Sequence, residues 1–88
     1  MRIEWDSKKA EANRRKHGVT FREAAAVLSD PLSVTISDLR ANEELRHVTV
    51  GLSDAGRTLV VVYADDGSVI RLISARRATK RERHEYET

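Results

Sequence analysis

The stretch LVVVYADDGSVIRLIS, residues 59–74, decides the fold. Its first part, residues 59–63, is apolar or aromatic at every position, which is typical of a strand buried on both faces. The following Asp65-Asp66-Gly67 has the residue types of a tight hairpin turn, so residues 69–74 are predicted to return as a second strand. The chain therefore contains an antiparallel pair whose first strand lies in the middle of a sheet.

Two further strands are predicted upstream of this hairpin. Apolar residues alternate with polar ones in both segments, at Leu32, Val34 and Ile36 and at Val48, Val50 and Leu52. A period of two predicts strands that are buried on one face. Because the connections are short turns, we expect an antiparallel meander of about four strands.

The first helix is predicted near the N-terminus, after a short strand at Ile3–Trp5. Asp6 or Ser7 has the residue type of an N-cap, and the helix is expected to run to about Lys16, where His17-Gly18 stops it. Its inward face is small and partly polar, with Ala10, Asn13 and His17 at spacings of three and four. We therefore expect this helix to contribute little to the core.

The second helix is predicted to begin at Thr20, because Thr20-Phe21-Arg22-Glu23 matches a capping box. In that motif the Thr20 hydroxyl accepts from the Glu23 amide, and the Glu23 carboxylate reaches back to the Thr20 amide. An amphipathic stripe follows at Phe21, Ala24, Ala25 and Leu28. Asp30-Pro31 ends the helix, since the residue before proline is disfavoured in helical conformation.

A capping box recurs near the C-terminus at Thr79-Lys80-Arg81-Glu82 and predicts a short final helix. The predicted fold is α+β in a single domain, residues 1–88, with two N-terminal helices packed on an antiparallel sheet of about four strands and a short C-terminal helix. No window is apolar enough for a membrane span, and there is no cysteine for disulfide or thiolate chemistry. A cytoplasmic location is expected.

The charges are unevenly distributed along the chain. Residues 1–29 carry seven Lys/Arg and four Asp/Glu, residues 30–66 carry three and seven, and residues 67–88 carry six and three. If the two basic ends met in the fold, they would form a positive surface suited to a phosphate backbone. Two solvated basic helices are the alternative interpretation.

The densest group of cations lies near the C-terminus, at Arg71, Arg76, Arg77, Lys80, Arg81 and Arg83. It covers a strand end, a turn and a helix start, where free backbone amides also favour anions, so phosphate binding is the preferred interpretation. Arg71 interrupts the last strand, and its guanidinium is expected either to pair with a carboxylate or to face a groove. The sequence leaves that choice open.

Catalysis without a metal or cofactor is the chemistry that these residues favour. The sequence has no glycine-rich phosphate loop, no paired-histidine helix and no clustered carboxylates. RNA cleavage can instead use the neighbouring 2'-hydroxyl as nucleophile, with a base, an acid and cations from the protein. His17 and Glu44 are the candidate bases; His17 could also simply cap its helix, and Glu44 could simply pair with Arg46.

Several fragments, in this order, resemble the pattern of BrnT toxins: Trp5-Asp6, Lys9-Ala10, Asn13, Lys16-His17-Gly18-Val19, Phe21, Asp30-Pro31, Glu44-x-Arg46, Gly51, Arg71-x-Ile73-Ser74-Ala75-Arg76-x-Ala78-Thr79 and Glu82-Arg83-x-x-Tyr86. The resemblance covers nearly the whole chain. It implies a fold similar to RelE-like ribonuclease toxins and inhibition of translation by metal-independent RNA cleavage. It also implies neutralisation by a BrnA-type antitoxin, through which the complex would bind operator DNA.

The candidate site residues combine this resemblance with the cation run. The expected catalytic residues are His17, Glu44, Arg46 and Arg76, and the expected RNA-binding residues are Lys16, Arg71, Lys80, Arg83 and Tyr86. Two other interpretations fit the charges: a nucleic-acid-binding module without catalysis, such as a regulator, and an interaction subunit for an acidic protein. Neither of these predicts that a His17 or Arg76 substitution abolishes toxicity.

Overall fold

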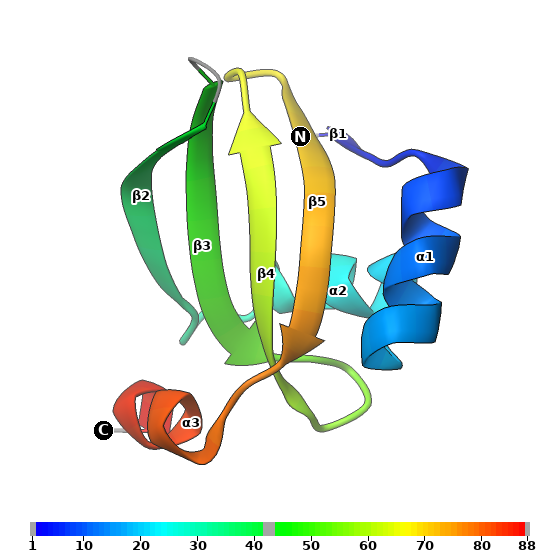
Figure 1. Ribbon diagram of the computed structural model, residues 1–88. Helices are drawn as coiled ribbons and strands as arrows, with labels where there is room; N and C mark the ends of the chain where they lie inside the picture. The colour runs from blue at the N-terminus through cyan, green and yellow to red at the C-terminus, as the bar shows by residue number, and fades with distance from the viewer. Residues whose placement is uncertain (1, 42–43, 88) are drawn as a thin grey trace.

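The computed structural model describes residues 2–41 and 44–87, with side chains described for all of these except residues 37–41, 44 and 45. A five-stranded sheet forms the centre, with the strands in the order β1-β5-β4-β3-β2 (Figure 1). The strands are β1 (Arg2–Glu4), β2 (Val34–Ala41), β3 (Glu44–Leu52), β4 (Thr58–Asp65) and β5 (Val69–Arg77). The helices are α1 (Ser7–His17), α2 (Phe21–Val27) and α3 (Lys80–Glu87).

The predicted antiparallel meander is confirmed for β2 to β5, and β4 is the central strand of the sheet. The Asp65-Asp66-Gly67 turn is present, with Gly67 at a φ of 95° and the Asp66 carboxylate accepting from the amides of Ser68 and Val69. The sheet also has a fifth strand, because β1 pairs in parallel with the start of β5. The sheet is therefore mixed rather than purely antiparallel.

One face of the sheet is covered by α1 and α2, and the core lies there. Apolar side chains of α2 and of the segment before it pack on the buried positions of β4 and β5, and the core residues are Val19, Phe21, Ala24, Val27, Leu59, Val61, Tyr63, Leu72 and Ala75. The period-two pattern of β4 sends alternate residues to the opposite face. We call this opposite side, which α1 and α2 leave uncovered, the open face.

Both ends of α1 follow the sequence prediction. Asp6 is the N-cap, and its carboxylate accepts from the amides of Lys8 and Lys9. Gly18 ends the helix in a left-handed conformation with a φ of 69°, a geometry that favours glycine. The helix buries only Asn13, in agreement with its weak apolar stripe.

The capping box predicted for α2 is half right. The Thr20 hydroxyl accepts from the Glu23 amide at 3.1 Å. The Glu23 carboxylate, however, does not follow the motif: it accepts from the Ser53 hydroxyl at 2.7 Å and from the Arg57 guanidinium. A charged partner from the β3–β4 loop has replaced the local amide, because an ion pair with several hydrogen bonds is stronger than a single cap contact.

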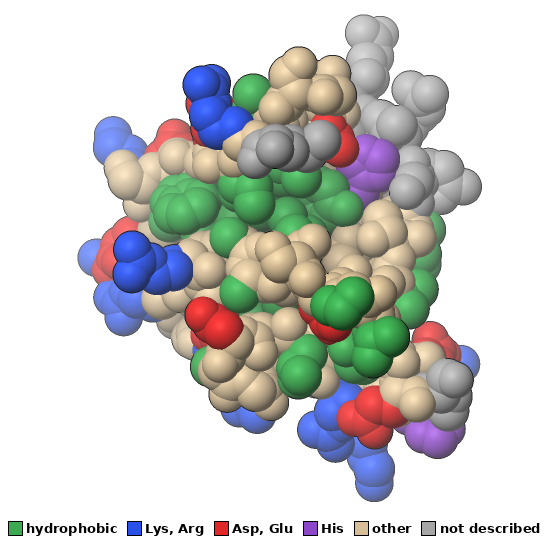
Figure 2. Space-filling model, turned by 180° about the vertical axis from the view of Figure 1, so that it is seen from behind, with side chains coloured by type: hydrophobic (Ala, Val, Ile, Leu, Met, Phe, Trp, Pro, Cys, Tyr) green, Lys and Arg blue, Asp and Glu red, His purple; other side chains and the backbone are tan. Residues whose placement is uncertain are grey.

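The two basic ends of the chain do not form one surface on the side that α1 and α2 cover. Figure 2 shows this side, with Lys and Arg side chains gathered over α1 and again over α3, and apolar, neutral and some acidic side chains between the two groups. Several of these cations are paired within their own helix, as Arg14 is with Glu11 and Arg81 with Glu85. The basic ends of the chain therefore do not define a phosphate-binding site on this side of the molecule.

Candidate functional site

Three arginines of β3 and β5 project from the open face of the sheet. Arg46 of β3 and Arg71 of β5 are both aligned with Ala64 of β4, one on each side of it. Arg76 is opposite Val60, which lies on the same face as Ala64, and Val60 is in turn opposite Val50 of β3. These three arginines share the side that α1 and α2 leave uncovered, and Arg2 of β1, which pairs with Glu4, lies on the same side.

A bulge in β5 is what brings Arg71 and Arg76 to the same face. The two residues are five apart, and strict alternation would send them to opposite faces. The register shifts between Val62 and Tyr63, whose partners are Ser74 and Leu72, so Ile73 is one extra residue. That extra residue reverses the alternation, as bulges near functional sites often do.

The three arginines form two separate groups along the strands. Arg46 is four residues before Val50, the β3 residue level with Arg76. At about 3.3 Å per residue, this separates the Arg46–Arg71 level from the Arg76 level by about 13 Å along the strands. A ligand that contacts both groups must therefore be extended.

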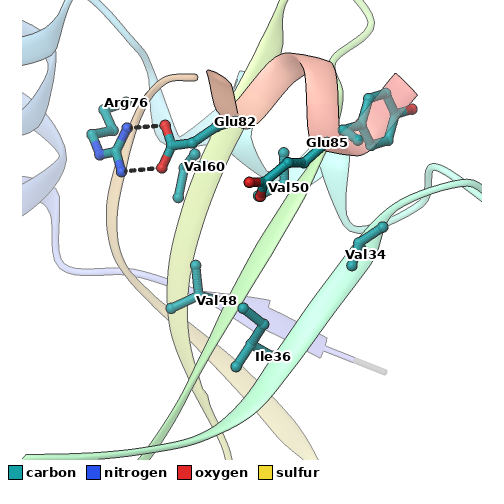
Figure 3. A pocket seen from close by; sticks show the side chains of 9 residues that line it. Val34, Ile36, Val48, Val50, Val60, Arg76, Glu82 and Glu85 are labelled. Atoms are coloured by element: carbon teal, nitrogen blue, oxygen red, sulfur yellow. Dashed lines mark hydrogen bonds and ion pairs between the residues drawn. The ribbon is translucent and has the colours of Figure 1, made fainter. Parts of the chain in front are cut away.

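The Arg76 end of the open face contains a groove. Its floor is apolar and comes from β2, β3 and β4, and its wall comes from α3 (Figure 3). The lining residues are Val34, Ile36, Val48, Val50, Val60, Arg76, Glu82, Glu85 and Tyr86. Figure 3 shows the Arg76 and Glu82 side chains facing each other at one end of this groove.

Arg76 and Glu82 make a two-pronged ion pair. Nη1 and Nη2 of Arg76 donate to Oε1 and Oε2 of Glu82 at 2.7 and 2.8 Å. This contact is the main reason that the pKa of Glu82 falls to about 2, with a smaller contribution from the Thr79 amide. The side chains keep 42% and 31% of their surface exposed, so the pair is accessible to solvent and to a ligand.

A capping box closes the start of α3, and the contacts of Glu82 with Arg76 and of Tyr86 with Asp30 join the helix to the rest of the protein. At its start, the Thr79 hydroxyl accepts from the Glu82 amide at 3.1 Å and the Glu82 carboxylate accepts from the Thr79 amide at 2.8 Å, so this capping box is complete. Near its end, the Tyr86 hydroxyl donates to Asp30. That hydrogen bond raises the pKa of Tyr86, and the pKa of Asp30 is lowered mainly by the Leu52 amide and next by Tyr86.

His17 and Lys16 lie at the end of α1, beside the β5 strand. Asn13 connects the two elements: its side-chain amide donates to the Ala75 carbonyl at 2.8 Å and accepts from the Ala75 amide at 3.0 Å. His17 follows Asn13 by one helical turn, and Ala75 precedes Arg76. His17 is half-buried, whereas Lys16 is exposed.

The other candidate residues are dispersed. Glu44 begins β3 at the end away from Arg76, and its side chain lies outside the described part of the structure. Lys80 and Arg83 are exposed on α3, where Arg83 pairs with Glu87 at 4.0 Å. Among the described residues, no group of three or more His, Asp or Glu side chains is arranged to hold a metal ion.

The sequence model of the family described as the ribonuclease toxin BrnT of type II toxin–antitoxin systems matches residues 5–82. The chain belongs to this family. As a BrnT-type ribonuclease toxin of a type II system, it has RNA as its implied target and an antitoxin as its implied partner. No curated protein matches its sequence.

The fold agrees with BrnT membership. The crystal structure of the Brucella abortus ribonuclease toxin BrnT is similar to this chain, with a TM-score of 0.67 and 25% sequence identity. The similarity covers 91% of this chain and 99% of the Brucella chain. The predicted α+β fold with two N-terminal helices, a sheet and a C-terminal helix is therefore confirmed. In the described residues no helix is long and apolar enough to cross a membrane.

The structure brings together some of the residues that were expected in a BrnT-like site. Arg46, Arg71 and Arg76 share the open face, and Tyr86 lines the same groove as Arg76. Lys16 and His17 approach the Arg76 end of β5 from the helix-covered side, through α1.

Sequence reasoning missed two residues that contact this site. Glu82 pairs with Arg76, and Asn13 holds the backbone beside it. The capping box at Thr79 placed Glu82 at the start of α3, but nothing in the sequence identified its second partner. Asn13 is one of the residues that carry the BrnT resemblance, but the sequence otherwise shows it only as a polar residue on an inward helix face.

Proposed function

We propose that the chain is an endoribonuclease that inhibits translation by cleaving RNA without a metal ion. The observation that carries the proposal is the position of Arg46, Arg71 and Arg76 on the open face of the sheet. Contacts between cations and phosphates supply most of the sequence-independent affinity for nucleic acid, so the arginines of this sheet face suit an RNA strand. Membership of a family of ribonuclease toxins supports RNA as the substrate.

The proposed reaction uses the 2'-hydroxyl of the substrate as the nucleophile. Its oxygen attacks the adjacent phosphorus while the bond from phosphorus to the 5' oxygen breaks, which yields a 2',3'-cyclic phosphate and a 5'-hydroxyl. The protein must accept the 2' proton, return a proton to the leaving oxygen and stabilise the charge on the phosphate oxygens. Arg76 suits the last role because a guanidinium can hold two phosphate oxygens at once.

His17 is the proposed general base, and Glu44 is the alternative. An imidazole titrates near neutral pH without help, whereas a glutamate needs a raised pKa. His17 is one helical turn from Asn13, which binds the residue next to Arg76, but His17 lies on the helix-covered side of the sheet and Arg76 on the open face, so a phosphate that both contact must lie beyond the end of β5. Glu44 is six residues before Val50 on β3, about 20 Å along the strand from the level of Arg76.

The remaining candidate residues, four cations and one tyrosine, would bind the flanking RNA. Arg71 lies beside the Arg46 level of the open face, while Lys16, Lys80, Arg83 and Tyr86 come from the ends of α1 and from α3. If the broken phosphate instead lies at the Arg46 end, then Arg46 and Glu44 take the roles proposed for Arg76 and His17. Comparing the turnover of Arg46→Ala with that of Arg76→Ala decides between the two ends.

We propose a BrnA-type antitoxin as the protein partner, acting in the cytoplasm where messages are translated. In this proposal operator DNA is bound only by the toxin–antitoxin complex, through the antitoxin. The family description, which names a type II toxin–antitoxin system, supports a protein antitoxin. Growth arrest and reduced translation are expected when the chain is expressed without that partner.

The decisive experiment uses purified toxin and a short RNA, with and without EDTA. We expect cleavage that survives EDTA, products ending in a 2',3'-cyclic phosphate by mass spectrometry, and no cleavage where the 2'-hydroxyl is replaced by hydrogen. Activity that is lost with EDTA and recovered with magnesium would contradict the metal-free mechanism. Binding of RNA with no cleavage by any preparation would favour a nucleic-acid-binding module instead.

A further inference from the structure

We propose that Glu82 is a positioning residue for RNA cleavage, which fixes the Arg76 guanidinium so that one edge of it faces the substrate phosphate. The inference rests on the proposed function. It gives a specific role to the one acidic residue within the run of cations between Arg76 and Arg83. The side chains of Arg76 and Glu82 both line the open-face groove, so their contact lies where a ligand can reach it.

The Arg76 guanidinium has five N–H groups. Two of them, one on Nη1 and one on Nη2, donate to the two oxygens of Glu82. A third, also on Nη1, donates to the Arg77 carbonyl at 3.3 Å. The remaining two N–H groups are on Nε and Nη2. Together they form the side edge of the guanidinium, which can bind two phosphate oxygens.

Glu82 is itself held firmly, and this makes it an effective clamp. Its carboxylate also accepts from the backbone amide of Thr79, a contact that does not depend on the Thr79 side chain. The far end of α3 is attached through Tyr86 and Asp30. The carboxylate therefore has a fixed position, and an arginine bound to it by two prongs loses most of its freedom to rotate.

A fixed guanidinium and a nearby negative charge have opposite effects on two measurable quantities. Orientation accelerates the chemical step, since a misplacement of about 1 Å can cost about a hundredfold in rate. The carboxylate also repels phosphate, so it weakens the binding of substrate. We therefore expect removal of the Glu82 charge to lower kcat while KM stays unchanged or falls, which loss of a merely structural contact would not do.

The test compares Glu82→Gln with Thr79→Ala in cleavage assays on a short RNA. Glutamine is accepted at this position of a capping box, so α3 should persist in the first variant. Thr79→Ala weakens the same helix start but leaves the contact with Arg76 intact, which makes it the matched control. We expect kcat to fall about tenfold to a hundredfold in Glu82→Gln and to stay within about threefold of wild type in Thr79→Ala.

A second comparison, between Arg76→Lys and the double variant Arg76→Lys/Glu82→Gln, tests whether Glu82 acts through Arg76. Lysine lacks the planar guanidinium that Glu82 is proposed to orient. In the Arg76→Lys background, the further change Glu82→Gln should therefore alter the rate by less than about threefold. Single-turnover assays with excess enzyme give measurable rates for these slow variants. An equal loss in both backgrounds would show that Glu82 acts independently of Arg76 and would overturn the proposal.

Two further results would also overturn it. A rise in kcat in Glu82→Gln would mean that Glu82 blocks Arg76, and an equal loss in Thr79→Ala would mean that Glu82 matters only as a helix cap. If the wild type cleaves RNA and Glu82→Gln is unchanged, this inference alone fails. If the wild type itself cleaves no RNA, the proposed function fails first and this inference with it.

Discussion

The helices α2 and α3 begin with the same local pattern, a threonine followed three residues later by a glutamate, yet the two glutamates have different partners. Glu23 leaves the cap and binds Arg57 and Ser53 on the helix-covered side of the molecule. Glu82 completes the cap and also binds Arg76 on the open face. The side chains of Glu23 and Arg57 keep 12% and 30% of their surface exposed, against 31% and 42% for Glu82 and Arg76.

The difference shows that a local motif positions the glutamate and the surrounding fold decides its role. The Glu23–Arg57 pair joins α2 to the β3–β4 loop and also touches the end of α1, because Arg57 donates to the Gly18 carbonyl. It is therefore expected to contribute to stability. The Glu82–Arg76 pair is more exposed and lies at a groove, so it is expected to contribute to activity.

The largest effect is expected for Arg76→Ala. Loss of one preorganised charge contact costs about a hundredfold to a thousandfold in rate, so cleavage and growth arrest should disappear. An ion pair this exposed contributes roughly 1 kcal/mol or less to folding, so the melting temperature should fall by no more than about 4–8 °C. Single-turnover assays and thermal melts measure the two quantities.

Arg81→Ala is the control for Arg76→Ala, since Arg81 belongs to the same cation run and its side chain is 91% exposed. It should keep its activity within about threefold of wild type, as surface substitutions usually change little. A collapsed melt of Arg76→Ala, or a variant that remains fully toxic, would remove Arg76 from the site.

Arg57→Ala is expected to show the opposite result. It leaves the mostly buried Glu23 carboxylate without its main partner, which should cost about 2–3 kcal/mol in the free energy of unfolding. The melting temperature should then fall by more than about 10 °C, while kcat of the folded fraction stays near wild type. Urea unfolding and activity at low temperature test this, and a large loss of kcat with normal stability would break the contrast between the two pairs.

Acid should weaken the Glu23–Arg57 and Glu82–Arg76 ion pairs, because it protonates the two glutamates. The pKa of Glu82 is lowered from 4.5 to about 2 in the folded state, so its contribution to stability is complete above pH 4.5 and is lost as the pH falls toward 2. The pKa of Glu23 is also lowered, mainly by Arg57. We expect the wild type to be more stable than Glu82→Gln at pH 6 and the two melting temperatures to converge near pH 2.

Calorimetric melts between pH 2 and pH 7 measure that convergence. The comparison must be made between variants, because Asp30 and Asp66 also have lowered pKa values and add to the acid sensitivity of the wild type. A constant difference between wild type and Glu82→Gln over the whole range would contradict the assignment.

The smallest effects are expected for the two cap threonines. Loss of an N-cap side chain typically costs about 1 kcal/mol. Thr20→Ala should lower global stability by about that amount, because α2 packs in the core. Thr79→Ala should hardly change it, because α3 buries none of its residues. Hydrogen exchange should instead show faster exchange of the α3 amides, and a larger global loss in Thr79→Ala than in Thr20→Ala would reverse the comparison.

The fold was predictable from the sequence because its signals are local. Asp6, Gly18 and the apolar stripe of α2 mark the helices, and the run at residues 59–63 marks the central strand. The parallel pairing of β1 with β5 was missed, since Ile3–Trp5 indicates a strand but carries no information about its neighbour. The partner of Glu23 was missed for the same reason, because Arg57 is 34 residues away in the sequence.

The site was less predictable, and the bulge in β5 explains why. Arg71 and Arg76 are an odd number of residues apart, so the alternation rule assigns them to opposite faces. Neither Ile73 nor Ser74 has a residue type that indicates a bulge. The composition therefore indicated a phosphate-binding region, but only the strand register shows which arginines share a face.

The hydrogen bonds between Asn13 and Ala75 also bear on how this protein avoids aggregation. Unpaired strand edges invite pairing with other chains. At one side of the sheet β1 covers the start of β5, and the Asn13 amide occupies the backbone groups of Ala75 further along, much as one residue of a further strand would. The opposite side ends at β2, which is eight residues long and has Val34 and Ile36 more than half exposed. Because this side offers only the short β1 and an interrupted stretch of β5, we expect any pairing between the sheets of two copies to use the longer β2 edge.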